Sequence, residues 1–171
     1  LPRGKTYARK GVVSGIKIDS NKIVAKVQGT QRSPYQVKIS IPEFTRAQSE
    51  KIVHLVTENP VYLSQLLNRQ LPPELNETFA RVGVHIFPKS WSDLKGRCSC
   101  PDSAVPCKHL ASVLYLIANE IDKNPFLVFE LHNFDLLGSL EANGFFAEGQ
   151  QETPILQVAT LQQPVNKKET R

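Results

Sequence analysis

The chain of 171 residues is 40% hydrophobic and 22% charged, which suits a domain with a buried core and excludes a wholly disordered protein. No apolar run reaches the roughly 18 residues of a membrane-spanning helix, and the basic opening predicts no signal peptide. The net charge of +5 is uneven, because residues 1–40 are strongly basic and residues 120–152 mostly acidic. Such asymmetry favours a basic face for an anionic partner. The alternative is two solvated surfaces of opposite sign.

Three short segments near the start, 11–18, 21–30 and 34–41, are rich in β-forming residues and are separated by turn-forming residues. They predict a small antiparallel sheet. Side chains alternate between the two faces of a strand. One face should therefore carry Lys17, Lys22, Lys26 and Lys38. The other face is apolar, and we expect helices to cover it.

From Thr45, a candidate N-cap, the apolar spacing becomes helical. We expect helices over residues 45–59, 61–70, 72–83, 107–122 and 126–143. Residues 84–91 should be extended. The helix over 107–122 has the widest apolar stripe and should be central.

All three cysteines and one of the four histidines lie within twelve positions: Cys98, Cys100, Cys107 and His109. Three thiolates and an imidazole form a complete tetrahedral set for Zn²⁺, and a closed set of four is typical of a structural site. The last two residues stand where the central helix should begin. A metal would therefore fix the preceding loop to that helix.

Other interpretations of the cluster remain open. The cysteines could be small buried hydrophobic residues, or the set could hold an iron–sulfur cluster. Cys107 and His109 could form a nucleophilic pair, although residues two apart on a helix point about 200° apart. The odd number of cysteines argues against a disulfide framework and favours a reducing compartment, the cytoplasm.

The pattern Cys-x-Cys, six residues, Cys-x-His resembles the signature of the SWIM zinc finger. The surrounding "CSCPD", "PCKH" and "NPFLVFEL" are similar to bacterial SWIM proteins, as are "YARKGVV", "VQGTQRSPYQVKI" and "LPPELNETFARVGVHIFP". The resemblance covers about residues 4–140. It implies a DNA-binding or protein-interaction module, with SWI/SNF-type helicases as partners of the bacterial members. The chain departs from the family at Ser103, where an aromatic residue is frequent, and at "LHNFDLLG", which replaces a basic, glycine-containing turn.

The predicted fold class is α+β, with a small N-terminal antiparallel sheet, a helical region and a Cys3His zinc knuckle leading into a central helix. We expect a basic sheet over 1–44, a helical segment over 45–86, the zinc finger with C-terminal helices over 87–146, and a flexible tail over 147–171. Because the chain contains no methionine, we expect it to be part of a longer protein.

The expected function is binding of nucleic acid, DNA in the first place, of a helicase partner, or of both. The candidate nucleic-acid contacts are Lys17, Lys22, Lys26, Lys38, Arg9, Lys10 and Arg32. The alternative is a protein-interaction adaptor without nucleic-acid contact, which docks its partner through the acidic helices after residue 120 or a sheet edge. With no Walker-type loop and with scattered carboxylates, we expect no enzymatic activity and no small-molecule substrate. Tyr7, Tyr35 and Trp91 could stack on bases, but packing roles are favoured.

Overall fold

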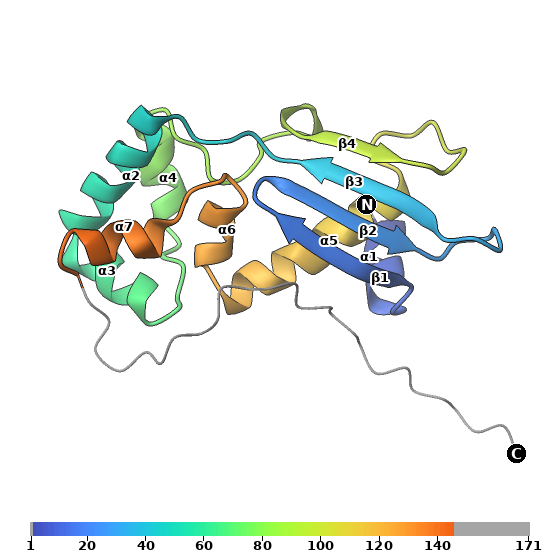
Figure 1. Cartoon of the computed structure of the whole chain (residues 1–171), viewed down its shortest axis with the longest axis horizontal. Coiled ribbons are helices and arrows are strands. Elements are labelled where there is room, and N and C mark those ends of the chain that lie inside the picture. Colours follow the sequence, from blue (N-terminus) through green and yellow to red (C-terminus); the bar gives the residue numbers. More distant parts are fainter. Residues whose placement is uncertain (1, 146–171) are drawn as a thin grey trace, which may run out of the picture.

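The computed structural model of the chain describes residues 2–145 and shows an α+β fold, as predicted (Figure 1). Four antiparallel strands form one sheet in the order β1-β2-β3-β4. Their bounds are Val13–Asp19 for β1, Lys22–Val27 for β2, Tyr35–Ser40 for β3 and Lys95–Cys98 for β4. The first three are the predicted strands. The fourth was not predicted, and it joins the sheet from a segment 55 or more positions away.

The sheet has one apolar and one basic face, because burial alternates along β2 and β3 as a period of two requires. Ile23, Ala25 and Val37 are at most 3% exposed. In β1 the pairing shifts between Ser14 and Lys17, and this bulge keeps Lys17 on the same face as its partner Val24. The basic face therefore holds all four predicted lysines and adds two cations of β4: Lys17, Lys22, Lys26, Lys38, Lys95 and Arg97.

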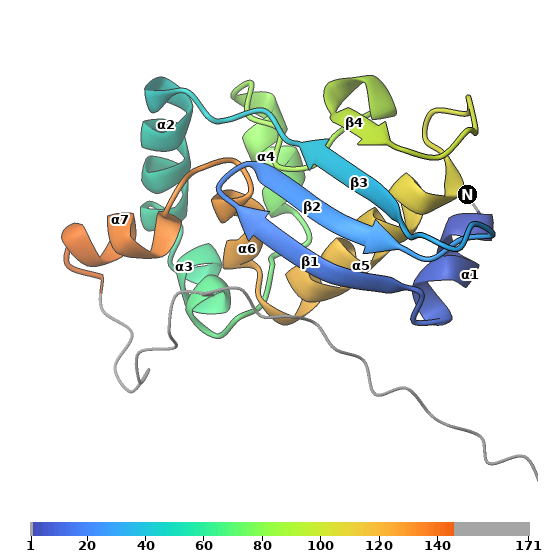
Figure 2. The same cartoon turned by 45° about the vertical axis from the view of Figure 1, so that its right-hand side comes forward.

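Helix α5 (Lys108–Lys123) covers the apolar face of the sheet, as expected for the central helix (Figure 1). Seven of its residues are buried, including Leu110, Val113 and Ile117. No helix of the described chain covers the basic face in either cartoon view (Figures 1 and 2). The sheet is thus the exposed layer of a two-layer structure.

The chain begins with a helix, α1 (Pro2–Arg9), in a region for which the sequence predicted only strands. It packs on α5 (Figure 2). A Cβ on Gly4 would lie 2.5 Å from the Cβ of Ala111, so only glycine permits this approach. Glycine also lowers helix propensity, which explains why local sequence patterns did not reveal the helix.

The opposite end of the molecule, here called the helical end, consists of five short helices. They are α2 (Arg46–Thr57), α3 (Pro60–Leu67), α4 (Leu75–Arg81), α6 (Phe126–Glu130) and α7 (Leu136–Ala142). Thr45 caps α2 as predicted: its hydroxyl accepts from Gln48 N, and the Gln48 side chain accepts from Thr45 N. Fully buried Ile52, Phe79 and Phe129 lie in its core.

Three local predictions differ from the structure. The single helix predicted over 126–143 is two helices, because Asn133 adopts a left-handed backbone (φ +58°) and Asp135 caps α7. Residues 84–91 contain bends and the start of a short 3-10 helix, Trp91–Asp93, instead of extended chain. Helix α4 begins at Leu75, three residues beyond the predicted start at Pro72. The predicted tail over 147–171 lies outside the described residues.

None of the helices between residues 2 and 145 combines the length and the apolar character needed to cross a lipid bilayer.

Candidate metal centre

The four candidate ligands come from three consecutive pieces of structure. Cys98 is the last residue of β4, and Cys100 lies two residues beyond it. Cys107 is the N-cap of α5, and His109 lies in the first turn of that helix. The backbone anchors the first pair to β3, because Ser99 N donates to Gln36 O while Gln36 N donates to Ser99 Oγ. The cluster therefore joins the sheet edge to the start of the central helix.

The structure brings the ligand atoms of Cys98, Cys100, Cys107 and His109 together, all within 4.8 Å of one another. His109 Nδ1 lies 3.8 Å from Cys98 Sγ and 4.0 Å from Cys107 Sγ. Two ligand atoms of a tetrahedral zinc site are roughly 3.5–3.8 Å apart, given Zn–S bonds of about 2.3 Å and Zn–N bonds of about 2.0 Å. The spacing therefore fits a single zinc ion, with Nδ1 as the nitrogen that would hold it.

Cys107 approaches His109 because it lies outside the helix. Its backbone is extended (φ −73°, ψ 167°), and its Sγ accepts from Leu110 N at 3.5 Å. The argument that two helical positions would separate these side chains by about 200° was therefore wrong for this pair. The N-cap position turns the thiol toward the side of the helix that carries the imidazole.

The His109 ring is enclosed by aromatic side chains and is only 2% exposed. Tyr35 lies against it at 4.6 Å between ring centroids, and Tyr7 meets it edge-on at 5.4 Å. A Cβ on Gly29 would lie 2.4 Å from the Tyr35 ring and 3.2 Å from His109 Nε2. Aromatic packing and a close backbone approach thus fix the ring. This packing bears out the favoured role of Tyr35.

His109 Nε2 is buried and has no hydrogen-bond partner among the described residues. A metal-bound histidine commonly donates its second N–H to a carboxylate or carbonyl group. Here the tyrosine rings orient the imidazole instead. No local sequence pattern indicates this arrangement, because Tyr7, Gly29 and Tyr35 are distant from residues 98–109 along the chain.

Burial sets the protonation of the cluster. It raises the pKa of the Cys98 thiol to about 12 and also raises the pKa of Cys107, with the neighbouring cysteines adding to both. Burial, reinforced by the Lys108 ammonium, lowers the pKa of His109. A neutral imidazole is the form that binds a metal, whereas the thiols must lose protons on binding. These are the features of a site that a divalent cation completes.

The candidate nucleic-acid contacts divide into two groups. Lys17, Lys22, Lys26 and Lys38 share the basic face. Arg9 ends α1, Lys10 follows it, and Arg32 lies in the connection between β2 and β3; these three are exposed but are not on the strands. Sequence reasoning missed Lys95 and Arg97 as members of the face, since the pairing of β4 with β3 is not visible in local patterns.

Comparison with known proteins agrees with the motif. Residues 81–118 match the model of the SWIM zinc finger family. The chain is 39% identical over 145 residues to "Uncharacterized protein Rv2102" of Mycobacterium tuberculosis, a match that covers 83% of this chain and 52% of the relative. The chain thus spans about half the length of that relative. No solved structure matches it. The chain therefore carries a zinc-binding SWIM finger and is homologous to this mycobacterial protein.

Proposed function

We propose that this SWIM module binds nucleic acid, DNA in the first place, through the basic face of its sheet, and that it does so without catalysing a reaction. The observation that supports the proposal is the gathering of six cations on a sheet face that no described helix covers. Cross-strand neighbours on this face include Lys38 and Arg97, and Ser40 and Lys95. Such a face attracts phosphates with little sequence preference.

The metal supports this function by positioning the edge of the face. Lys95 and Arg97 lie on β4, three and one positions before Cys98. When bound, zinc would hold that strand to α5 through the two ligand pairs. The metal is structural in this proposal, and three free cysteines suit a reducing compartment such as the cytoplasm.

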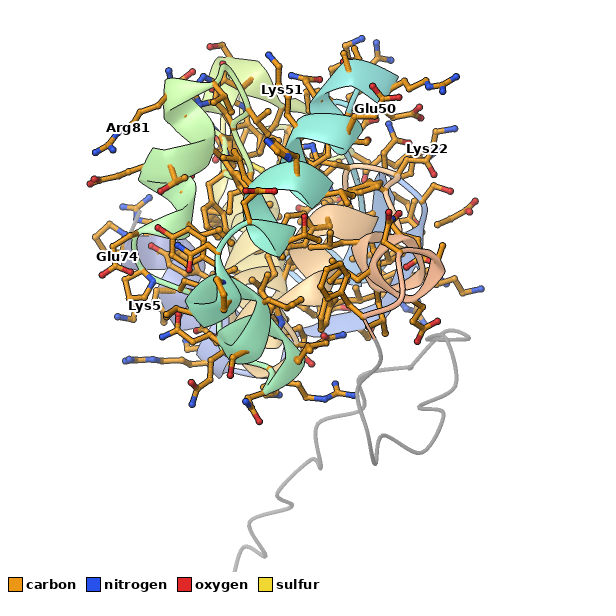
Figure 3. All side chains as sticks on the ribbon, turned by 90° about the vertical axis from the view of Figure 1, so that its left-hand side faces the viewer. Lys5, Lys22, Glu50, Lys51, Glu74 and Arg81 are labelled. Carbon is orange, nitrogen blue, oxygen red and sulfur yellow. The ribbon has the colours of Figure 1, made fainter. Side chains whose placement is uncertain are left out.

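A salt-titrated binding assay with a labelled DNA tests the proposal. Lys17, Lys22, Lys26 and Lys38 are replaced together by Glu; we expect affinity to fall steeply and the salt dependence to flatten, since log K falls with log [salt] by about 0.9 for each phosphate neutralised on duplex DNA. The control replaces Arg46, Lys51, Arg81 and Lys89 by Glu; these are exposed cations away from the strands. Lys51 and Arg81 are labelled in Figure 3. Equal affinity of the two variants would contradict the proposal.

The second candidate is a protein adaptor that docks a helicase-type partner through the acidic helices after residue 120. It draws support from Glu130 and Asp135, since burial and the neighbouring Asp135 carboxylate raise the pKa of Glu130. Two like charges near each other suit a basic partner surface. A pull-down with a helicase supports this candidate if binding is lost in Glu130→Gln, Asp135→Asn and retained in the four-lysine variant.

A further inference from the structure

A hollow of about 840 Å³ lies along the sheet edge at β4 and continues onto the basic face. We call it the β4 hollow. Four cations line it: Lys22, Lys38, Lys95 and Arg97. No acidic residue of the described chain contributes to its lining. All charged residues that line the hollow are therefore cations, and its charge complements a polyanion.

The same hollow contains an apolar surface that phosphate binding does not explain. Val24 is 37% exposed, and Val105, in the loop between the two ligand pairs, is 68% exposed. Trp91 also lines the hollow and is partly buried. Gly96 pairs with Ile39, which is buried on the apolar face, and a Cβ on Gly96 would lie 2.5 Å from the Trp91 ring. The indole therefore lies against β4 on the apolar side of the sheet, where it lines the hollow at the sheet edge.

We propose that the β4 hollow binds single-stranded nucleic acid, with bases against Trp91, Val24 and Val105 and phosphates against the surrounding cations. This inference rests on the proposed function and specifies its substrate. A duplex keeps its bases stacked inside and would leave these apolar groups unused. An unpaired strand offers both a charged backbone and flat apolar base faces, which a positively charged groove with an aromatic residue recognises.

The metal centre forms part of this site. Arg97 directly precedes the ligand Cys98, and Val105 lies two positions before the ligand Cys107. Both walls of the hollow are thus attached to ligands of one cluster. Binding of the single-stranded nucleic acid should therefore depend on the metal, which acts by holding the walls of the hollow in place.

Trp91 is the only tryptophan in the chain, so intrinsic fluorescence reports on this hollow directly. The full chain is titrated with a twelve-nucleotide oligo(dT) and with a duplex of equal length. We expect the single strand to quench the fluorescence and to bind more tightly than the duplex. Stronger duplex binding with unchanged fluorescence would overturn this inference and leave the proposed function standing. If neither DNA binds, both the proposed function and this inference are wrong. Both are also wrong if only a poly-glutamate peptide, and neither DNA, quenches the fluorescence.

Variants locate the contact by fluorescence anisotropy of the labelled strand. Val105→Glu and Arg97→Glu should each weaken single-strand binding about tenfold or more. Val61→Glu should not, although Val61 on α3 is 62% exposed against 68% for Val105. Loss of stacking in Trp91→Leu should weaken single-strand binding by about five- to 160-fold, and Trp91→Phe should restore part of it. Circular dichroism confirms that each variant is folded. If Val105→Glu and Val61→Glu bind alike, the hollow is not the site.

Discussion

The two ends of the molecule are held together by different means. The helical end has a core of fully buried apolar side chains, among them Ile52, Phe79 and Phe129. At the metal end, residues 99–106 form no helix or strand. Side chains from the loop and its two ends, Cys98, Cys100 and Cys107, converge on the candidate metal site. The helical end therefore depends on apolar burial. At the metal end the sheet and α5 share that apolar core, but the loop over 99–106 depends on the ligand cluster.

The difference also concerns charge. At the helical end, exposed acids and bases alternate, as Glu50, Lys51, Glu74 and Arg81 illustrate (Figure 3). The sheet beside the metal carries six cations and one acidic residue, Asp19, on one face. A mixed surface keeps a protein soluble without favouring a partner, whereas a surface dominated by one sign attracts a partner of the opposite sign. In the function proposed above, the basic face makes the contact with the partner, whereas the helical end contributes a buried apolar core.

Removing the metal should affect the two ends most unequally. In Cys107→Ser, one thiolate ligand is lost, and with it most of the roughly 10 kcal/mol or more that a structural zinc contributes. Zinc content by mass spectrometry should drop from one per chain to near zero. Amide exchange should rise around residues 95–110 and less in α2 and α7. Ser103→Ala, an exposed loop residue, is the control; uniform loss of protection over both ends would contradict the comparison.

Phe129→Ala should produce the converse pattern. The ring is fully buried and meets Phe79 edge-on at 6.2 Å between centroids. We expect a loss of about 3–5 kcal/mol in the free energy of unfolding, measured by urea denaturation. Zinc binding should persist in the folded fraction. If Phe129→Ala keeps its stability but loses zinc, the helical end is not stabilised separately from the metal end.

Acid should weaken the metal end first. Burial raises the pKa of Cys98 and Cys107, so both thiols are protonated at neutral pH and release protons when zinc binds. Zinc affinity should then fall as pH falls, by about tenfold per pH unit for each proton released. If both thiols release a proton, the fall is about 100-fold per pH unit. Competition with a chromophoric chelator between pH 8 and 6 measures this. A flat profile would show that the thiols ionise without the metal.

Thr45→Ala should cause the smallest change. It removes the side-chain oxygen that accepts from Gln48 N at the start of α2. The expected cost is about 1 kcal/mol by thermal or urea unfolding, and Thr45→Ser should restore it. Zinc affinity should be unchanged, since this cap is distant from the cluster; a coupled loss would show that the two ends do not act separately.

Local sequence patterns predicted the structure correctly wherever the interactions that determine it lie between residues close together in the chain. The alternation in β2, the N-cap at Thr45 and the stripe of α5 are set by neighbours within one or two turns. The ligand set was visible for the same reason, because Cys98 to His109 span twelve positions. The split after Glu130 was missed, because a left-handed asparagine within an apolar run leaves no clear pattern.

By itself, the sequence determined which atoms can hold a metal and which lysines share a strand face, since ligand chemistry and strand periodicity are local properties. Only the tertiary structure decided that β4 pairs with β3, which adds Lys95 and Arg97 to the basic face. It also decided that α1 packs on α5 through Gly4 and that Tyr35 lies against His109. These contacts join segments tens of residues apart, and their formation depends on the closure of the whole core, which no short stretch of sequence encodes.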